Sequence, residues 1–404
     1  MPLKTLSPNG LIAVMFTATV SGMVGIVAYP ALLPTYKAAW GLSNTSAGWI
    51  SGVYFAGYAA AVPVVSALTD KIDARRIVLF GLLISIIAPI GFSLTATDLV
   101  TASLWWGLQG VGFAGIYMPG LKALNERVSL ELRDHAAAIF TATFTVGVSI
   151  SFSLTGILAE LFGWRGAFMI FAGGPVMGIV LIIMFVQPKS PQPLVQARPL
   201  FDFKPVLQNR RALAHSIAYA VHNGESAVMR AWIVALLVFA ASQQAQLNFK
   251  FDLAPTTIAT LMTLSGLPAI LLASKLTQHI NRRWVIVTIM ALSATAGIAL
   301  ALSLHQAFSA VFAIAIFYGF IVTADSGIIN ASLLARAEPD RLGTSMAVHA
   351  TLAFTAAFLM PFLFGAILDF AGGENSAQAW LTAFATMAAF IAIGPLALFV
   401  LDRD

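Results

Sequence analysis

The sequence predicts an all-α membrane protein with twelve transmembrane helices, and its composition is the first reason. Of the 404 residues, 59% are hydrophobic and only 10% are charged, whereas soluble domains carry about 25% charged residues. The apolar residues fall in long runs, and about 20 such residues span the hydrocarbon core of a bilayer as a helix. A membrane β-barrel would instead show alternating segments of about ten residues. We therefore expect the lipid bilayer to surround this chain.

Twelve apolar runs have the length that a membrane span requires. They cover residues 11–35, 46–68, 77–97, 99–121, 136–161, 166–187, 213–240, 254–275, 285–304, 308–333, 344–368 and 377–401. A hydrophilic stretch separates the first six runs from the last six. We expect an N-terminal six-helix bundle over residues 1–187, a cytoplasmic central loop over 188–212 and a C-terminal six-helix bundle over 213–404.

The distribution of Lys and Arg predicts the orientation of these spans. With the N-terminus inside, 18 of the 22 basic residues fall in inner segments, three fall in outer loops, and Arg230 lies within a span. Inner loops of membrane proteins carry such an excess of Lys and Arg. We expect a multi-pass protein of the cell inner (plasma) membrane with both termini in the cytoplasm.

Several classes of function and partner are not expected. The chain has no cysteine, which excludes disulfides, cysteine metal sites and thiol catalysis. It contains no HExxH or GxSxG pattern, so we expect no enzyme, no metal and no cofactor. A net charge of +5 would suggest nucleic acid for a soluble protein. Here the basic residues lie between apolar runs, and we expect a monomer without a nucleic-acid partner.

One glycine pattern resembles a nucleotide-binding motif. Residues Gly110 to Gly115 read GVGFAG, which fits the dinucleotide fingerprint, but that fingerprint requires a preceding strand and a helix that starts there. Here it lies inside an apolar run. We expect these glycines, and likewise Gly174 and Gly178, to allow close packing of helices.

The two halves of the chain share short stretches of sequence. SALTDKIDARRIV from Ser66 matches SKLTQHINRRWVI from Ser274 at an offset of 208, so that Asp73 corresponds to Asn281. GILAELFG, which begins at residue 156, matches GAILDFAGG, which begins at residue 365, at an offset of 209. The two offsets are nearly equal. They predict two pseudo-symmetric six-helix units in parallel orientation, one of the arrangements from which transporters are built.

With this layout, the chain resembles the major facilitator superfamily (MFS) over nearly its whole length. The resemblance rests on the six-plus-six spans, the basic loop after the second span, the GWRGAF segment at residues 163–168 and the central loop rich in Pro and Arg. It implies the MFS fold and a secondary active transporter that works by alternating access on a small-molecule substrate.

The loop after the second span carries the signature of this family in part. The signature Gly-x-x-x-Asp-Arg/Lys-x-Gly-Arg-Arg matches at Asp70, Lys71 and Arg75. It departs at Ser66, Asp73 and Ala74. The resemblance implies that this loop braces the cytoplasmic gate through charge pairs at helix ends. The alternative is that its basic residues serve only as a positive-inside anchor.

Two motifs associated with drug/proton antiporters are incomplete. Trp106 stands where the family places an Arg on the fourth helix, and the segment from Gly147 to Gly156 has no proline. Both differences disfavour the antiporter interpretation.

The seventh span contains charged residues that are candidates for function. Charged side chains within a bilayer cost about 2.5–3.5 kcal/mol each on insertion scales, so they are functional candidates by default. Glu225 is expected near the middle of the membrane, with His222 one turn earlier on a neighbouring part of the same face. Arg230 lies about 140° around the helix from Glu225. It suits an anionic substrate because Arg stays charged and binds carboxylate or phosphate in a bidentate manner.

Further candidates lie on the tenth and fourth spans. Asp325 and Asn330 lie deep in the tenth span, and the fourth span contributes Gln109, Tyr117 and Lys122. In the resembled family, helices 1, 4, 7 and 10 line the cavity. The deep charges therefore fall on two of these four helices.

These residues lead to one expected function and its alternatives. Glu225 or Asp325 could carry the coupling proton, since burial in a membrane disfavours an ionised carboxyl. We expect proton-coupled uptake of a small organic anion; the alternative is proton-driven efflux of a metabolite or an amphipathic drug. The charged residues could also form purely structural pairs between helices. His222 and His349 could relay protons or simply pack.

Overall fold

The computed structural model describes residues 6–190, 204–246, 253–338 and 341–402. Contacts divide the chain into two compact units. Unit 1 comprises Met1–Tyr29 and Val53–Ala197, and unit 2 comprises Pro30–Gly52 and Arg198–Asp404. Apart from the segment 30–52, this division follows the two halves of the repeat. Of the expected central loop, residues 191–203 lie outside the described residues.

Ten helical segments of the described chain are long and apolar enough to cross a bilayer. One of them, Leu130–Phe185, has 56 residues, more than twice the length of about 20 that a span needs. The first expected span, 11–35, is missing from the ten because it is divided into shorter helices. Counting the long segment twice and the first span once gives the twelve spans that the sequence predicts.

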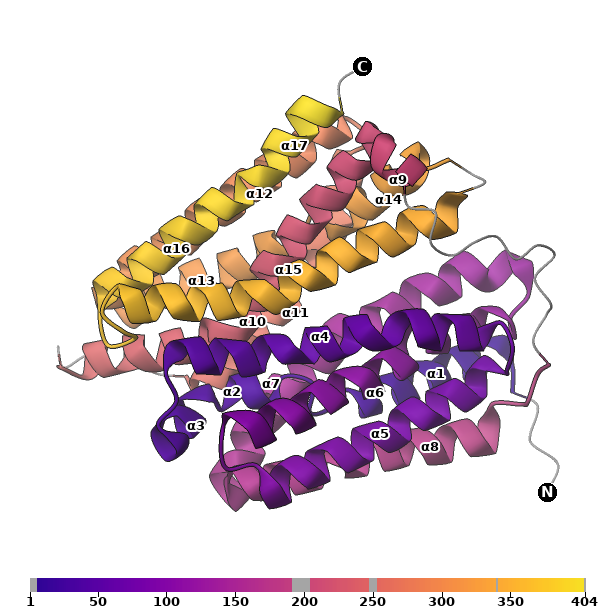
Figure 1. Cartoon of the computed structure of the whole chain (residues 1–404), viewed down its shortest axis with the longest axis horizontal. Helices are drawn as coiled ribbons and strands as arrows, with labels where there is room; N and C mark the ends of the chain where they lie inside the picture. The colour runs from indigo at the N-terminus through magenta and orange to yellow at the C-terminus, as the bar shows by residue number, and fades with distance from the viewer. Residues whose placement is uncertain (1–5, 191–203, 247–252, 339–340, 403–404) are drawn as a thin grey trace. The chain divides into compact units, whose positions relative to one another are not determined.

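Unit 1 contains the helices of the first six spans. They are α1 (Pro8–Gly22), α2 (Ala28–Ala31, which reaches the boundary with unit 2), most of α4 (Asn44–Thr69), α5 (Ala74–Thr95), α6 (Leu99–Asn125), η1 (Leu130–Leu132), α7 (Arg133–Phe171) and α8 (Gly173–Phe185). The helix α5 packs along α6, and α8 packs against α1 (Figure 1). Leu82, Ile116 and Phe140 belong to the buried apolar cluster that joins these helices.

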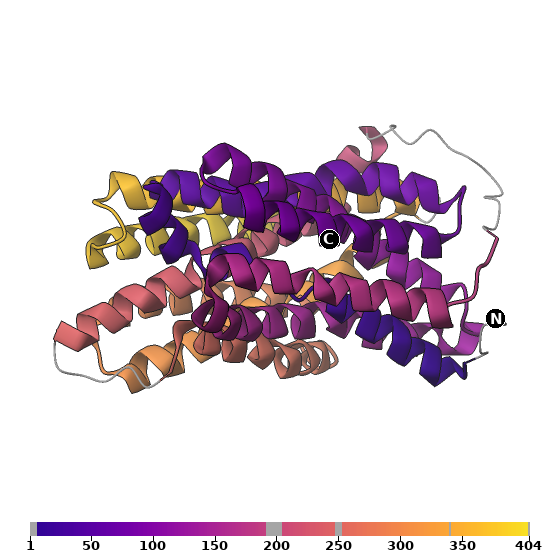
Figure 2. The same ribbon diagram turned by 90° about the horizontal axis from the view of Figure 1, so that it is seen from below.

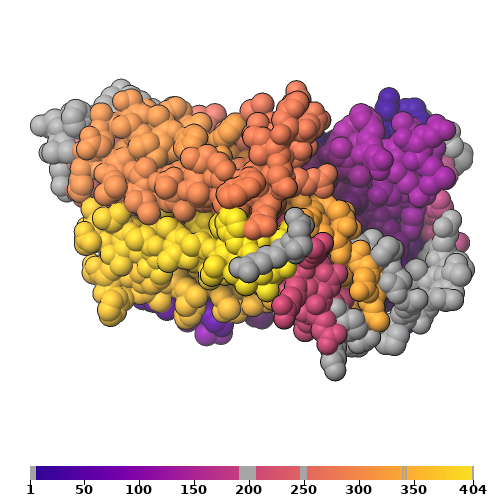
Figure 3. Space-filling view, turned by 90° about the horizontal axis from the view of Figure 1, so that it is seen from above, coloured from indigo at the N-terminus to yellow at the C-terminus, as the bar shows by residue number. Residues whose placement is uncertain are grey.

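Unit 2 contains the remaining helices. They are α3 (Leu33–Trp40), α9 (Lys204–Gln208), α10 (Arg210–Gln246), α11 (Pro255–Leu276), α12 (Arg282–Leu302), η2 (Ser303–His305), α13 (Phe308–Val322), α14 (Ser326–Arg336), α15 (Leu342–Phe370), α16 (Ala377–Ile391) and α17 (Ile393–Leu401). The long helix α10 packs against α14, α15 and α17 (Figures 1 and 2). The yellow helices α16 and α17 lie at the surface of unit 2 in Figure 3.

Capping side chains lie at the starts of two corresponding helices, α5 and α12. Asp73 accepts a hydrogen bond from the backbone N–H of Arg75 at the start of α5, and Asn281 accepts one from the N–H of Arg283 at the start of α12. Side-chain oxygens at the N-cap satisfy amides that have no partner within the helix. The residues that the repeat aligns therefore perform the same local task in both units.

The fifth and sixth spans meet at a glycine. Gly163, the first residue of GWRGAF, has φ +68° and ψ 169° inside α7, a region that residues with a side chain rarely adopt. This position ends the fifth span and starts the sixth, which agrees with the expected spans 136–161 and 166–187.

Two expected spans are interrupted over three or more residues, while the sixth and twelfth break at a single residue each, Ala172 and Ala392. The first is interrupted between α1 and α2 at residues 23–27, and the tenth between α13 and α14 at residues 323–325. At the second break the Thr323 hydroxyl bonds to the carbonyls of Gly319 and Phe320 at 3.4 Å each, and the Ser326 hydroxyl bonds to the Thr323 carbonyl at 3.1 Å. Hydroxyls that compete for helix carbonyls in this way favour bends. Apolar length alone did not predict these breaks.

The glycine-rich segment within α6 allows close approach of helices, as predicted. A Cβ atom at Gly110 would lie 1.9 Å from the Tyr54 carbonyl oxygen, and one at Gly115 would lie 2.9 Å from the Gly81 Cα atom. A Cβ atom at Gly174 would lie 2.3 Å from the Ser21 carbonyl oxygen. These positions have no room for a side chain, so the packing interpretation is confirmed.

Candidate functional site

Helix α10 carries Glu225 into the interior of unit 2. The residue is only 3% exposed. Its carboxyl accepts hydrogen bonds from the Ser293 hydroxyl of α12 and from the Tyr318 hydroxyl of α13. A buried carboxyl needs such partners, because an unpaired polar group in an apolar interior is costly. Two neighbouring helices therefore help to fix the position of Glu225.

The break in the tenth span brings Asp325 next to the histidine of α10. Asp325 immediately precedes α14, its side chain is 3% exposed, and its Oδ1 lies 2.8 Å from His222 Nδ1. Asp325 is also close enough to Glu225 for the two carboxyl groups to interact electrostatically. The structure thus gathers His222, Glu225 and Asp325, from two spans 100 residues apart, into one buried group.

This group, which we call the acid–imidazole cluster, consists of His222, Glu225 and Asp325. His222 Nδ1 and Asp325 Oδ1 lie 2.8 Å apart, so they form an ion pair when the imidazole is protonated. Among the residues that the structure describes, no group of three His, Asp or Glu side chains is arranged to hold a metal ion.

Asn330 and Arg230 lie elsewhere in the same unit. The Asn330 amide nitrogen donates to the Ser326 carbonyl at 3.0 Å, and its Oδ1 lies 2.9 Å from His349 Nε2. Arg230 is half-buried on α10, five residues beyond Glu225. Asn330 and Asp325 share the tenth span in the sequence, whereas in the structure the Asn330 amide contacts His349.

The candidates of the fourth span lie on α6 in unit 1. Gln109 is buried and lines a cavity of about 10 Å³ together with Trp106, a volume that holds about one water molecule. Tyr117 packs among aromatic rings, with centroids 5.6 Å from Phe113 and 5.7 Å from Phe140. The cavity beside Gln109 is thus too small for an organic substrate, and Tyr117 belongs to an aromatic cluster.

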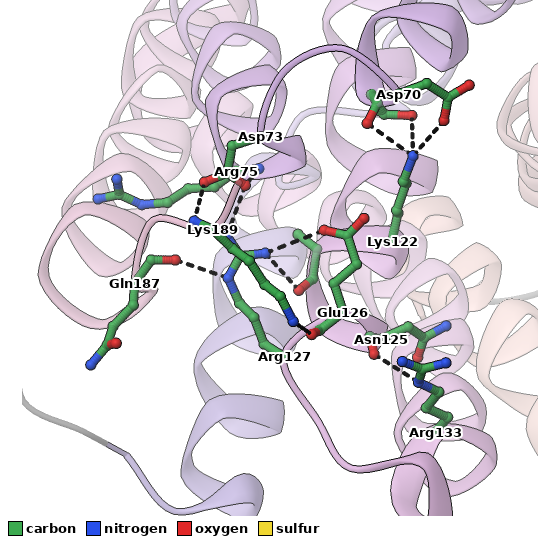
Figure 4. A network of polar contacts seen from close by, with 12 residues as sticks. Asp70, Asp73, Arg75, Lys122, Asn125, Glu126, Arg127, Arg133, Gln187 and Lys189 are labelled. Carbon is green, nitrogen blue, oxygen red and sulfur yellow. Dashed lines mark hydrogen bonds and ion pairs between the residues drawn. The ribbon is translucent and has the colours of Figure 1, made fainter. Parts of the chain in front are cut away.

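The third α6 candidate, Lys122, contacts the loop after the second span (Figure 4). Its ammonium group lies 2.7 Å from Asp70 Oδ1 and donates to the Thr69 carbonyl at 2.9 Å. Lys122 also lines an open concavity of about 420 Å³ at this end of α6. The contact with Asp70 makes Lys122 a brace between α4 and α6.

The other two residues of the expected gating loop differ in their contacts. Arg75 donates to the carbonyls of Ile182 and Ile183 at 3.4 and 3.2 Å, and so ties the start of α5 to the end of α8. Lys71 is exposed. Asp70 and Arg75 thus both connect helix ends in unit 1.

Asp73 has a role in this loop that the sequence pattern did not predict. Besides capping α5, it forms an ion pair with Arg127 Nη2 at 2.7 Å and accepts the Lys189 backbone N–H at 2.8 Å (Figure 4). Burial raises the pKa of the Asp73 carboxyl, but the bonds from Lys189, Arg127 and Arg75 lower it further, so its pKa lies below the ordinary value. Its position opposite Asn281 in the repeat was the available signal, because both residues suit an N-cap.

Unit 2 has a cluster that resembles the one around Asp73, but its carboxyl group belongs to Asp402 and not to the corresponding loop. Arg336 lies 209 residues after Arg127, which is the offset of the repeat. Its Nε lies 2.9 Å from Asp402 Oδ1, while Arg283 donates to the Asp402 carbonyl at 3.1 Å. The Asp402 side chain also lies 3.2 Å from His215 Nε2. The acid is thus supplied by the C-terminal end of the chain rather than by the loop.

A third polar cluster of unit 2 lies at the C-terminal end of α15. Asp369 accepts hydrogen bonds from the backbone N–H groups of Asn44 and Thr45, at 3.1 and 2.8 Å, and from both of their side chains. Lys37 forms an ion pair with Glu374 at 2.6 Å nearby. Asp369 therefore caps the start of α4, a helix whose later part belongs to unit 1.

Known proteins resemble this chain in both sequence and fold. A probable hexose phosphate transport protein of Chlamydia pneumoniae is 25% identical over 195 residues, which cover 48% of this chain and 40% of that protein. A benzoate transport protein of Acinetobacter baylyi is 28% identical over 184 residues, covering 43% of this chain and 38% of that protein. The matched segments therefore span less than half of these relatives.

A solved structure matches almost the whole fold. It is a bacterial homolog of the human lysosomal transporter Spinster, with a TM-score of 0.76 and 14% identity over 98% of this chain and 97% of that one. At this identity the match concerns the fold alone, and it confirms the expected fold class. The sequence model of the family described as "Major Facilitator Superfamily" matches residues 14–249 and 227–404 of this chain. Because these ranges cover nearly all of the chain, the protein belongs to the Major Facilitator Superfamily.

Proposed function

We propose that this protein carries a small organic anion into the cell together with protons, by alternating access. The observation that carries the proposal is the buried acid–imidazole cluster of His222, Glu225 and Asp325. A proton-coupled transporter needs a group that gains and loses a proton inside the membrane, and intramembrane carboxyl and imidazole groups can serve as that group.

Three further features support the anion and the orientation in the membrane. Arg230, half-buried on the same helix, supplies a permanent positive charge that suits a carboxylate or phosphate. The excess of Lys and Arg in the inner loops supports a cytoplasmic location of both termini in the plasma membrane. Relatives whose names refer to hexose phosphate and benzoate transport agree with an anionic substrate.

The experiment uses purified protein in liposomes with an alkaline interior and radiolabelled benzoate as the probe. We expect the wild-type protein to accumulate benzoate under the pH gradient faster than protein-free liposomes, into which neutral benzoic acid diffuses unaided. Glu225→Gln removes the titratable group but keeps an acceptor for Ser293, so accumulation should be lost while benzoate exchange continues. Glu160→Gln, which changes an exposed carboxyl on α7, is the matched control and should behave as the wild type. Normal accumulation by Glu225→Gln would refute the assignment of the coupling proton.

Proton-driven efflux of an amphipathic cation is the second candidate. It is favoured by the two buried carboxyl groups of the cluster, which would attract a cation in place of the proton. The same vesicles distinguish the two functions with tetraphenylphosphonium as the probe. Proton-driven tetraphenylphosphonium movement without benzoate movement would favour efflux.

A further inference from the structure

The small cavity beside Gln109 in unit 1 is lined by polar atoms that lack partners. Its volume is about 10 Å³, and its walls come from α5, α6, α7, α8 and Gly25 in the interruption of the first span. Ser85 on α5 and Trp106 and Gln109 on α6 also line it, and none of the three is more than 7% exposed. Within the part of the chain that the structure describes, Ser85 Oγ, Trp106 Nε1 and Gln109 Oε1 have no hydrogen-bond partner.

Three orphaned polar atoms around one cavity are unusual in a folded protein. Buried polar groups nearly always bond to protein atoms or to ordered water, because an unpaired one carries the full penalty of its desolvation. Trp106 and Gln109 lie one turn apart on α6, yet the indole N–H does not bond to the amide oxygen. The three atoms therefore share the cavity without satisfying one another.

A proline of α5 adds a further polar group at this place. Pro89 lies inside α5 and lines the cavity. Proline has no N–H, so the carbonyl four residues earlier, that of Ser85, lacks its usual donor within the helix. Carbonyls that a proline frees in a membrane helix are satisfied by side chains, neighbouring helices or ordered water. Ser85 thus brings a hydroxyl and a carbonyl without its helical donor to the same turn.

The donors and acceptors determine which kind of molecule fits the cavity. Trp106 Nε1 only donates, Gln109 Oε1 only accepts, and the Ser85 hydroxyl does either. The occupant must accept one hydrogen bond and donate another within the volume of about one water molecule. A metal cation does not accept a hydrogen bond from an indole N–H, and a halide ion does not donate one to an amide oxygen. Water does both.

We propose that unit 1 binds one structural water molecule in this cavity. The water accepts a hydrogen bond from Trp106 Nε1, donates one to Gln109 Oε1 and makes a third with Ser85 Oγ, and a buried water typically makes about three such bonds. It links α5 to α6 beside the interruption of the first span. Gln109, predicted as a candidate for substrate binding, is thereby assigned to a water molecule. Substrate and proton coupling play no part in this inference.

The water can be detected at the indole N–H itself. The whole protein is labelled with ¹⁵N-tryptophan and reconstituted in lipid, and magnetisation transfer from water to each indole N–H is measured by solid-state NMR. Trp232 is the matched control, since it is buried and its Nε1 donates to the Pro361 carbonyl at 3.1 Å. Trp106→Phe and Trp232→Phe assign the two signals. We expect a water cross-peak for Trp106 and none for Trp232, and a Trp106 signal without that cross-peak would overturn the proposal.

The stability of Gln109→Leu distinguishes a hydrated cavity from a dry one. This variant keeps most of the side-chain volume and removes the acceptor. In a dry cavity it removes an orphaned polar atom and leaves the stability unchanged or higher. With water bound, it should raise the equilibrium constant for unfolding about fivefold or more, as measured by denaturant titration in detergent. An unchanged or lower unfolding constant would overturn the proposal.

A double variant tests whether the two side chains hold the same molecule. Trp106→Phe removes the N–H together with part of the ring, so its coupling to Gln109→Leu is the informative quantity. If one water bridges both, the double variant should raise the unfolding constant by less than the product of the two single factors. Gln244→Leu, the same change at a buried glutamine of unit 2, should combine with Trp106→Phe as a simple product. A simple product for Trp106→Phe with Gln109→Leu would overturn the proposal.

Two further outcomes complete the test. If Trp106→Phe does not fold, Gln109→Leu should still weaken the water cross-peak of one indole, and no change in any indole signal would overturn the proposal. A rise in Tm with NaCl but not with choline chloride, abolished by Gln109→Leu, would indicate a cation in place of water and would overturn it too. Every readout is taken without substrate, so failure here leaves the proposed transport function untouched.

Discussion

The ion pair between Asp73 and Arg127 should contribute more to stability than the helix cap that Asp73 also provides. Their side chains are 8% and 7% exposed, so the pair is largely hidden from water. Removing one partner of a buried pair costs about 3–5 kcal/mol. Arg127 keeps two other acceptors, the carbonyls of Gln187 and Ala123. We therefore expect Asp73→Asn to cost about 2–3 kcal/mol, the range of a hydrogen bond to a charged group.

Unit 2 provides the matched control for this experiment. Asn281 caps α12 with the same geometry but is exposed, so Asn281→Ala should cost only the cap, about 1 kcal/mol. Asp73→Asn keeps a capping side chain and loses the charge, so the two variants separate the cap from the ion pair. The free energy of unfolding is measured by denaturant titration in detergent. An Asp73→Asn cost no larger than that of Asn281→Ala would refute the reasoning.

The stability that the Asp73–Arg127 ion pair contributes should depend on pH. The pKa of Asp73 is lower in the folded protein than its ordinary value, which for Asp is about 3.9. The resulting stabilisation is complete above that ordinary pKa and is lost as the pH falls through the folded pKa. The difference between wild type and Asp73→Asn should therefore be constant from pH 6 to 8 and shrink below about pH 4.

Three other perturbations have definite expected results. Gly48→Ala places a Cβ 2.2 Å from the Pro361 carbonyl oxygen and should cost about 1–3 kcal/mol by overpacking, whereas Gly173→Ala, with nothing within 4 Å, should be neutral or stabilising in the same unfolding assay. Asp369→Ala removes four hydrogen bonds from the start of α4 and should lower the stability by about 1–2 kcal/mol; an unchanged Tm would contradict this. Benzoate or phosphate at 100 times its Kd should raise the stability by about 2.7 kcal/mol, and Arg230→Ala should remove that shift; a shift that persists would exclude Arg230 from the anion site.

Local and compositional features of the sequence were sufficient to predict the membrane spans and the repeat. Apolar length decides whether a segment crosses a bilayer, and so the spans could be counted from the sequence alone. The packing role of the glycines in α6 also followed from their place inside an apolar run. A charged side chain within a bilayer carries a high free-energy cost, and for this reason Glu225 and Asp325 could be singled out from the sequence alone.

The partners of these residues depended on the tertiary structure. The contact of His222 with Asp325 requires a break in the tenth span, and that break depends on hydroxyl bonds that apolar patterning does not encode. The ion pair of Asp73 with Arg127 joins residues 54 positions apart. The two polar partners of His349 come from two other helices, α14 and α10. A side chain's charge and helix can be read from the sequence, but its hydrogen-bonding partners depend on how helices distant in the chain pack together.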